Sequence, residues 1–290
     1  DWSSDVCSSD LVAMAGALAE YFGAIEGASL EANKGAYSYA WMIIFAVIAA
    51  IMVLIGLYHI RMLPSNQIPS TTKKTTSEVG RELVAVIANF FTKKHIFYYI
   101  CFIILYRLAE GFIMKIAPLF LRASREVGGL GLSLKEIGTL NGVFGSAAFV
   151  LGSLLAGIYV SKFGLKRTLF TLCCIFNLPF LAYTFLAVTQ PTNVYLIGTC
   201  ITMEYFGYGF GFVGLTLFMM QQIAPGKHQM SHYAFASGIM NLGVMLPGMV
   251  SGYFSDLLGY RNFFIYVLIA TIPAFLITYF IPFTYDDSKK

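Results

Sequence analysis

Long stretches without a charged side chain are the feature that most restricts how this chain can fold. No aspartate, glutamate, lysine or arginine occurs in residues 35–60, 168–203 or 205–226. Charged residues make up 12% of the sequence and apolar residues 58%, whereas a soluble domain carries roughly 25% charged residues. So little polar surface excludes a soluble enzyme, a disordered chain and a nucleic-acid-binding domain. The sequence predicts an integral membrane protein.

The apolar stretches have the length of membrane-crossing helices. A helix needs about 20 apolar residues to cross a bilayer, whereas a barrel strand needs only about 10 alternating ones. We therefore expect an all-α membrane fold. It should have a partial span at 11–23 and full spans near 37–58, 96–121, 136–160, 167–188, 194–220, 232–255 and 262–283.

The connections between the spans predict the orientation, because lysine and arginine concentrate on the cytoplasmic side. One side holds twelve of these residues: Arg61, Lys73, Lys74, Arg81, Lys93, Lys94, Lys162, Lys166, Arg167, Lys227, Lys289 and Lys290. The other side holds Lys34, Arg122, Arg125, Lys135 and Arg261. We expect the loop 59–95 and the C-terminus in the cytoplasm.

Two segments outside the predicted spans are a polar N-terminal stretch and an amphipathic helix. Residues 1–10 are rich in serine and aspartate and run directly into apolar sequence, so we expect them to be a non-native leader. Residues 77–91 place Val79, Leu83, Val86 and Phe90 on one helical face. This amphipathic helix is either a joint between two halves of the protein or a linker packed on lipid.

The last six spans contain two copies of one pattern. The pattern G-x-x-x-[S/D]-x-x-G-x-[K/R] occurs at residues 157–166 and again 95 positions later at 252–261. Glu110 and Glu204 are 94 residues apart, each in the first span of its copy. A repeat of three spans must be inverted across the bilayer relative to its neighbour. Paired inverted three-span repeats are typical of secondary transporters.

The same segments resemble a known family. Residues 157–167 (GIYVSKFGLKR) resemble the loop signature of the major facilitator superfamily, with Ser161 at its usual aspartate and Leu165 at its first basic position. More narrowly, residues 106–112 (YRLAEGF), 204–211 and 252–260 resemble the AmpG-type muropeptide permeases. The resemblance implies a gating role for the loop residues Gly157, Ser161, Lys162, Gly164, Lys166, Arg167, Gly252, Asp256, Gly259 and Arg261.

The resemblance also implies a division of the chain, because the superfamily has twelve spans in two six-span halves. Residues 11–58 would end the N-terminal half, 59–95 would be the cytoplasmic central linker, and 96–283 would form the C-terminal six-helix half. Residues 284–290 would be a cytoplasmic tail. The implied activity is proton-coupled uptake of a muropeptide or related sugar or peptide across the bacterial inner membrane by alternating access. The implied partners are the lipid bilayer, the solute, protons and the missing N-terminal half.

Four charged residues interrupt the spans and are the candidates for chemistry: Arg107, Glu110, Lys115 and Glu204. A charge in mid-bilayer costs about 2.5–3.5 kcal/mol on insertion scales, so such groups must pair or face water. Arg107 and Glu110 have the i, i+3 spacing of a helical ion pair. Tyr106 and Tyr208 lie beside these charges in the helical pattern.

In the functional interpretation these residues line a central cavity. Arg107 would bind a carboxylate of the solute, and Glu110 and Glu204 would carry protons. Lys115 would either reach that cavity or extend to the membrane surface. The structural alternative is a charge network that only fixes helix packing.

The remaining motifs give no support to an enzyme or a cofactor. Residues 209–214 match G-x-G-x-x-G inside an apolar span, where close helix packing explains the glycines better than a dinucleotide site. His228 and His232 have no third ligand nearby, so we expect solvated loop histidines and no metal site. The functional alternative to a transporter is a non-transporting membrane sensor or scaffold of the same fold.

Overall fold

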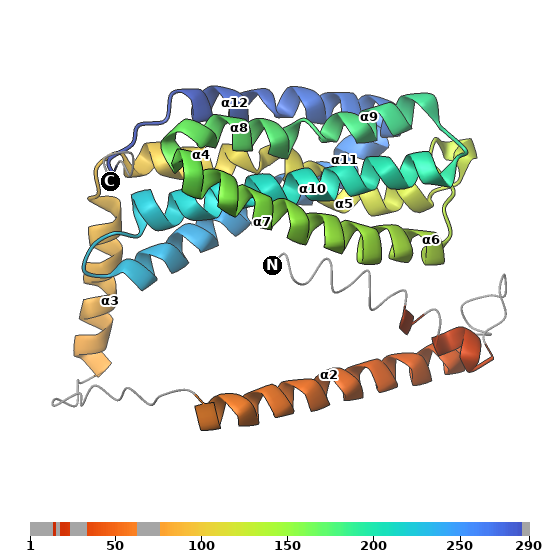
Figure 1. The fold of residues 1–290 in the computed structure, drawn as a ribbon, viewed down its shortest axis with the longest axis horizontal. Helices are drawn as coiled ribbons and strands as arrows, with labels where there is room; N and C mark the ends of the chain where they lie inside the picture. The colour runs from red at the N-terminus through yellow and green to blue at the C-terminus, as the bar shows by residue number, and fades with distance from the viewer. Residues whose placement is uncertain (1–13, 16–17, 24–33, 63–75, 286–290) are drawn as a thin grey trace. The chain divides into compact units, whose positions relative to one another are not determined.

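Helices make up nearly all of the described chain (Figure 1). The computed structural model describes residues 14–15, 18–23, 34–62 and 76–285. They belong to two units, Trp2–Arg81 and Glu82–Lys290. The predicted leader 1–10 and residues 11–13 and 16–17 of the predicted partial span at 11–23 lie outside the described residues. So do residues 286–290 of the predicted tail.

The first unit contains one complete span, α2 (Lys34–Met62). It is 29 residues long, more than the about 20 needed to cross a bilayer, and it contains the predicted span 37–58. Only Ala40 and Ile44 are buried. The apolar surface of α2 is therefore available to lipid or to another part of the protein.

The helix α3 (Thr76–Phe91) agrees with the predicted amphipathic helix at 77–91. Val86 and Phe90 are buried in the second unit, whereas Leu83 is exposed. The ring of Phe90 lies 5.8 Å from that of His232 and 5.5 Å from that of Phe235, both in α11. The C-terminal part of α3 is therefore packed against α11.

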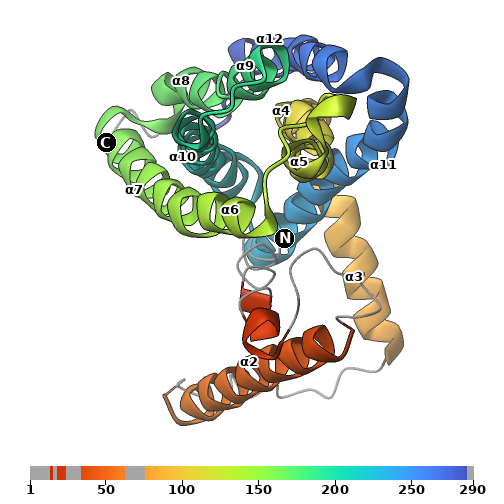
Figure 2. The same ribbon diagram turned by 90° about the vertical axis from the view of Figure 1, so that its right-hand side faces the viewer.

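The second unit holds the six predicted spans of the C-terminal part. Their elements in chain order are α4 (Ile96–Tyr106), α5 (Leu108–Arg122), the 3-10 turn η1 (Arg125–Val127), α6 (Leu134–Gly138), the π-helix η2 (Thr139–Gly145), α7 (Ser146–Phe163), α8 (Leu165–Asn177), α9 (Phe180–Thr189), α10 (Val194–Phe218), the π-helix η3 (Met219–Ile223), α11 (Gln229–Ala270) and α12 (Ile272–Tyr279). Figure 2 shows this bundle end-on, with α10 between α7 and α8 and with α5 beside α11.

Length and composition identify five candidate spans among the described residues: Lys34–Met62, Ile96–Arg122, Lys135–Phe163, Leu165–Thr189 and Gln229–Tyr279. The last is 51 residues long and contains the predicted span 232–255 and most of the predicted span 262–283. The predicted span at 194–220 is not among the five, although α10 has 25 residues. Its glutamate, tyrosines and glycines lower its hydropathy, and α10 buries much of its surface against its neighbours instead.

The backbone conformation confirms the two-copy pattern at the second glycine of each copy. Gly164 has φ 78° and ψ 147°, and Gly259, 95 residues later, has φ 69° and ψ 159°. This conformation is essentially restricted to glycine. A Cβ added at either position would meet no atom within 4 Å, so the backbone angle and not the packing requires glycine there.

The two repeats also cross each other in equivalent ways. A Cβ added at Gly111 of α5 would overlap the Pro247 ring of α11. A Cβ added at Gly152 of α7 would overlap the Phe206 carbonyl oxygen of α10. Phe206 lies 95 residues after Gly111, and Pro247 lies 95 residues after Gly152. The second helix of each repeat therefore crosses the first helix of the other at corresponding positions.

Hydrogen bonds fasten the loop after the first span to the end of the third span in both repeats. In the first repeat, Arg125 donates to the carbonyl oxygens of Gln190 (3.0 Å) and Pro191 (2.9 Å). In the second, the Gln222 carboxamide accepts from the backbone amides of Thr284 (2.9 Å) and Tyr285 (3.0 Å).

The loop after α10 is held by a lysine as well. Lys93 donates to the carbonyl oxygens of Ile223 and Pro225, the latter at 2.7 Å. Partial burial lowers the pKa of Lys93. These bonds connect the chain just after α3 to the end of η3.

The glycine turns give the first prediction. Replacing Gly164 or Gly259 with alanine should destabilise the protein by about 1–3 kcal/mol, because a Cβ strains this backbone conformation. Thermal unfolding of the detergent-solubilised chain measures the effect. Gly157→Ala and Gly252→Ala are matched controls, since a Cβ at either helical position meets no atom within 4 Å. Equal midpoints for turn variants and controls would contradict the role of the turns.

Candidate functional site

An arginine stands where the first span of the bundle is interrupted. The helix α4 ends at Tyr106 and α5 begins at Leu108, and Arg107 between them has φ −103° and ψ 6°. Only 4% of the residue is exposed. A buried guanidinium needs a partner, and the first turn of α5 supplies one.

Arg107 forms a bidentate ion pair with Glu110. Its Nε donates to Glu110 Oε2 at 2.6 Å, and its Nη2 contacts Glu110 Oε1. Both residues are buried. The planar guanidinium matches the two oxygens of a carboxylate, which makes this the stronger kind of charged hydrogen bond. The predicted i, i+3 ion pair is thus present.

The pair is connected to the second repeat through α10. Arg107 Nη2 also donates to the Tyr208 hydroxyl at 3.1 Å. The ring of Phe212, one turn further along α10, lies 5.3 Å from the guanidinium carbon. A cation above an aromatic face gains electrostatic attraction. Arg107 is therefore held by a carboxylate from its own helix and by two aromatic residues from α10.

A second bond joins the same helices. The Tyr106 hydroxyl donates to the Gly211 carbonyl oxygen at 2.9 Å. Tyr106 is fully buried, and a Cβ added at Gly211 would overlap Phe176 of α8. The glycines of the 209–214 motif lie inside α10, where they face α7 and α8 closely. They serve helix packing, as expected.

Glu204 lies one turn before Tyr208 on α10 and is half-buried. No hydrogen bond or ion pair to its carboxylate is found among the described residues. One helical turn separates it from Tyr208, which accepts a hydrogen bond from Arg107. The structure thus brings Glu204 near the Arg107–Glu110 pair and leaves it outside that pair.

Lys115 does not join this cluster. Its side chain is exposed, and its aliphatic part passes Gly248 of α11, where an added Cβ would lie 3.5 Å from Lys115 Cγ. Of the four intramembrane charges that the sequence singled out, three therefore gather between α5 and α10.

The predicted gating residues lie at the two equivalent turns. Ser161, at the usual aspartate position, donates to the Ile158 carbonyl oxygen at 2.9 Å. The charged members of the set are exposed: Lys162, Lys166, Arg167, Asp256 and Arg261. Gly157 and Gly252 face open space, and Gly164 and Gly259 form the turns themselves.

One sequence interpretation is wrong. We expected solvated loop histidines, but His232 lies in the first turn of α11 and is fully buried. Its Nε2 lies 3.4 Å from the Val86 carbonyl oxygen of α3. The packing of α3 covers this ring, which the sequence pattern did not predict. Among the described residues, no group of three metal-ligating side chains is present.

Sequence reasoning missed the aromatic residues that enclose the site. Phe149 of α7 and Phe176 of α8 lie 5.7 Å and 5.6 Å from the Tyr208 ring, and Phe212 lies below Arg107. Phe212 follows Glu204 and Tyr208 at four-residue spacing, which was a usable signal. Phe149 and Phe176 come from other helices and gave none.

Comparison with known proteins identifies the family. The family model of the Major Facilitator Superfamily matches residues 11–223. The chain belongs to that superfamily. Its all-α bundle, its apolar helices and its paired repeats agree with the fold predicted from sequence.

Curated relatives are of the AmpG type, as the motifs predicted. The chain is 23% identical to the anhydromuropeptide permease of Escherichia coli (strain K12) over 209 residues, which cover 72% of this chain and 41% of that protein. It is 25% identical to a protein named AmpG 1 from Rickettsia bellii over 238 residues, 81% of this chain and 56% of that one. The chain therefore spans about two fifths to just over half of these relatives.

The ion pair gives the second prediction. Glu110→Gln should destabilise the protein by about 3–5 kcal/mol, because it leaves the Arg107 charge buried without a counter-charge. Tyr208→Phe removes the hydrogen bond with Arg107 but keeps the ion pair, and should cost only about 1–3 kcal/mol. Thermal midpoints in detergent measure both effects.

A double variant is the control for the ion pair. Replacing Arg107 with methionine and Glu110 with leucine removes both charges, and should recover much of the loss seen in Glu110→Gln. If the double variant is as unstable as the sum of Arg107→Met and Glu110→Leu measured singly, the two side chains are not energetically coupled.

Proposed function

We propose that this chain forms the C-terminal half of a secondary transporter that imports a carboxylate-bearing solute together with protons. The supporting observation is the buried Arg107–Glu110 pair, bonded to Tyr208 across the two repeats. In transporters with inverted repeats, binding sites lie near the bilayer midplane between repeats. The ion pair occupies a break in the first span, where such sites are formed.

Arg107 is the residue proposed to bind the solute. In the present arrangement the carboxylate of Glu110 occupies two of its nitrogens. Protonation of Glu110 would weaken this pair and free the guanidinium for a carboxylate of the solute. Release of the solute would then favour the return of Glu110 to its charged form. Binding of the proton and of the solute would thus be coupled at one side chain.

Glu204 is proposed as the second proton carrier. Its carboxylate is half-buried and has no hydrogen bond or ion pair among the described residues. Carboxyl groups inside membrane spans commonly carry protons in pumps and transporters. Tyr208, one turn away, links its helix to Arg107.

The proposed solute is a cell-wall muropeptide or a related sugar or peptide. The name of the Escherichia coli relative says that it is an anhydromuropeptide permease. Peptides carry carboxylates, which a bidentate arginine recognises.

Transport is proposed to need a second six-helix half. The chain spans only part of its relatives, and alternating access requires two bundles that move against each other around one site. Residues 11–58 would belong to that other half, and 59–95 would link the two in the cytoplasm. The excess of lysine and arginine on one side supports this orientation in the bacterial inner membrane.

The sensor or scaffold alternative has no specific observation in its favour, since the family and the relatives are those of transporters. An enzyme is disfavoured in the same way.

The proton role gives the third prediction. In the intact transporter, Glu204→Gln should abolish accumulation driven by a pH gradient, because the amide cannot carry a proton. A gradient of one pH unit sustains about tenfold accumulation of a solute that moves with one proton. Uptake of labelled muropeptide into proteoliposomes measures this ratio. Glu126→Gln, at an exposed glutamate outside the site, is the control. Undiminished accumulation by Glu204→Gln would remove Glu204 from the coupling mechanism.

The need for a second half gives the fourth prediction. The 290-residue chain alone, reconstituted in liposomes, should show no uptake above protein-free liposomes, because one wall of the proposed cavity is absent. The intact transporter in the same lipids is the positive control. Saturable uptake by the 290-residue chain would overturn this part of the proposal.

A further inference from the structure

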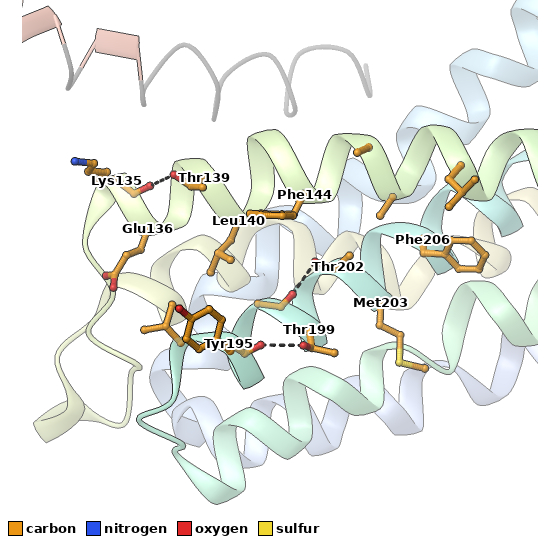
Figure 3. Close-up of a pocket in the computed structure, with 15 residues that line it drawn as sticks. Lys135, Glu136, Thr139, Leu140, Phe144, Tyr195, Thr199, Thr202, Met203 and Phe206 are labelled. Carbon is orange, nitrogen blue, oxygen red and sulfur yellow. Dashed lines mark hydrogen bonds between the residues drawn. The ribbon is translucent and has the colours of Figure 1, made fainter.

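A wide apolar groove runs along the helix that carries Tyr208, on another of its faces. It has a volume of about 1020 Å³ and lies between α6, η2 and α7 on one side and the first half of α10 on the other (Figure 3). That volume is at the upper end of the roughly 300–1,000 Å³ typical of ligand pockets. Neither Glu204 nor Tyr208 lines it.

Helix geometry separates the groove from the proposed transport site. Phe206 lines the groove and lies two residues from both Glu204 and Tyr208. Two residues correspond to about 200° around a helix, so Phe206 points away from both of them. The groove is a second feature of the bundle and not an extension of the Arg107 cluster.

The threonine hydroxyl groups that line the groove already donate hydrogen bonds within their own helices. Thr139 donates to the Lys135 carbonyl oxygen at 2.8 Å, Thr199 to Tyr195 at 2.9 Å and Thr202 to Gly198 at 2.7 Å. Figure 3 shows these bonds within the helices. The threonines therefore offer no free donor to a ligand. The other residues along the groove are mainly apolar, including Leu140, Phe144, Leu151, Met203 and Phe206.

Only one end of the groove is polar. Lys135, Glu136 and Tyr195 lie there. The Glu136 carboxylate caps α6 by accepting from the Ser133 amide and hydroxyl, both at 2.8 Å. Lys135 is exposed and has no ion-pair partner among the described residues. Tyr195 is 88% exposed, and tyrosine is enriched at membrane interfaces.

The length of the groove matches one leaflet of a bilayer. From Val194 to Phe206 the helix α10 rises about 18 Å at about 1.5 Å per residue. The hydrocarbon core of a bilayer is about 30 Å thick, so each leaflet contributes about half of that. A ligand in this groove would thus have a charged group at one end and hydrocarbon over the depth of a leaflet.

We propose that this groove binds a membrane phospholipid, with its phosphate at Lys135 and its acyl chains along α7 and α10. The cation at the rim is complementary to the phosphate. Away from its polar end, the described walls of the groove offer no free donor, which disfavours sugars and peptides because their polar groups would lose water without replacement. The bound lipid would cover the face of α10 opposite to the face that contacts Arg107.

The test uses the 290-residue chain in liposomes of phosphatidylcholine that contain a small fraction of photoreactive phosphatidylglycerol. The reactive group is at the end of an acyl chain, and adducts are mapped by mass spectrometry. We expect adducts concentrated in residues 139–151 and 198–206. Adducts spread evenly over the exposed apolar residues of α7, α8 and α11, or cross-links to a second copy of the chain there, would overturn the proposal.

Variants sharpen the test at each end of the groove. Met203→Trp fills the groove and should remove most of these adducts, whereas Met249→Trp, at an exposed methionine of α11 outside it, should not. Ala147→Phe is a second filling variant if the first fails to fold.

Lys135→Gln should reduce the preference for phosphatidylglycerol over phosphatidylcholine about fivefold, and Lys94→Gln should leave it unchanged. Retained adducts in a folded filling variant would contradict the site.

These readouts measure lipid binding without transport. If lipid binding in the groove is not found, the proposed transport function is not contradicted. If uptake is not found, the proposed lipid site is not contradicted.

Discussion

A charge buried between membrane helices must find a partner, and in this bundle that requirement connects the two repeats. Arg107 is satisfied by Glu110 on its own helix and by Tyr208 and Phe212 on α10. Without these partners, the guanidinium would cost several kcal/mol. The position of α10 relative to α5 is thus fixed by the same contacts that present a cation and a carboxylate to the interior.

Close helix crossings make those contacts possible. Each repeat places its second helix across the first helix of the other, and a glycine lies at each crossing, Gly111 in one and Gly152 in the other. The glycine belongs to the first helix at one crossing and to the second helix at the other. What the repeats share is therefore the close approach of the two helix backbones. A glycine on either of the two helices permits this approach. Small residues have this role generally in membrane helices, where packing and not the hydrophobic effect holds helices together.

The helix α10 has two contrasting faces. One holds Glu204, Tyr208 and Phe212 beside the buried ion pair. The other forms the floor of an apolar groove whose threonine hydroxyls are all bonded within their helices. The polar face helps to keep α10 out of the five candidate spans, and its glycines pack tightly against α7 and α8. Movement of α10 during transport would therefore change the surroundings of both faces together.

The sequence by itself determined the fold class, the approximate positions of the spans, the inverted repeat and the Arg107–Glu110 pair. These depend on local quantities: the length of apolar runs, the spacing of three residues on one helix and the conformation that only glycine adopts at residues 164 and 259. Tertiary structure alone decided that His232 is buried beneath α3, that Lys115 stays apart and that Phe149 and Phe176 enclose Tyr208. Those outcomes depend on which helices pack together and how they are rotated. Residues far apart in the chain set that arrangement, so no pattern along one segment reveals it.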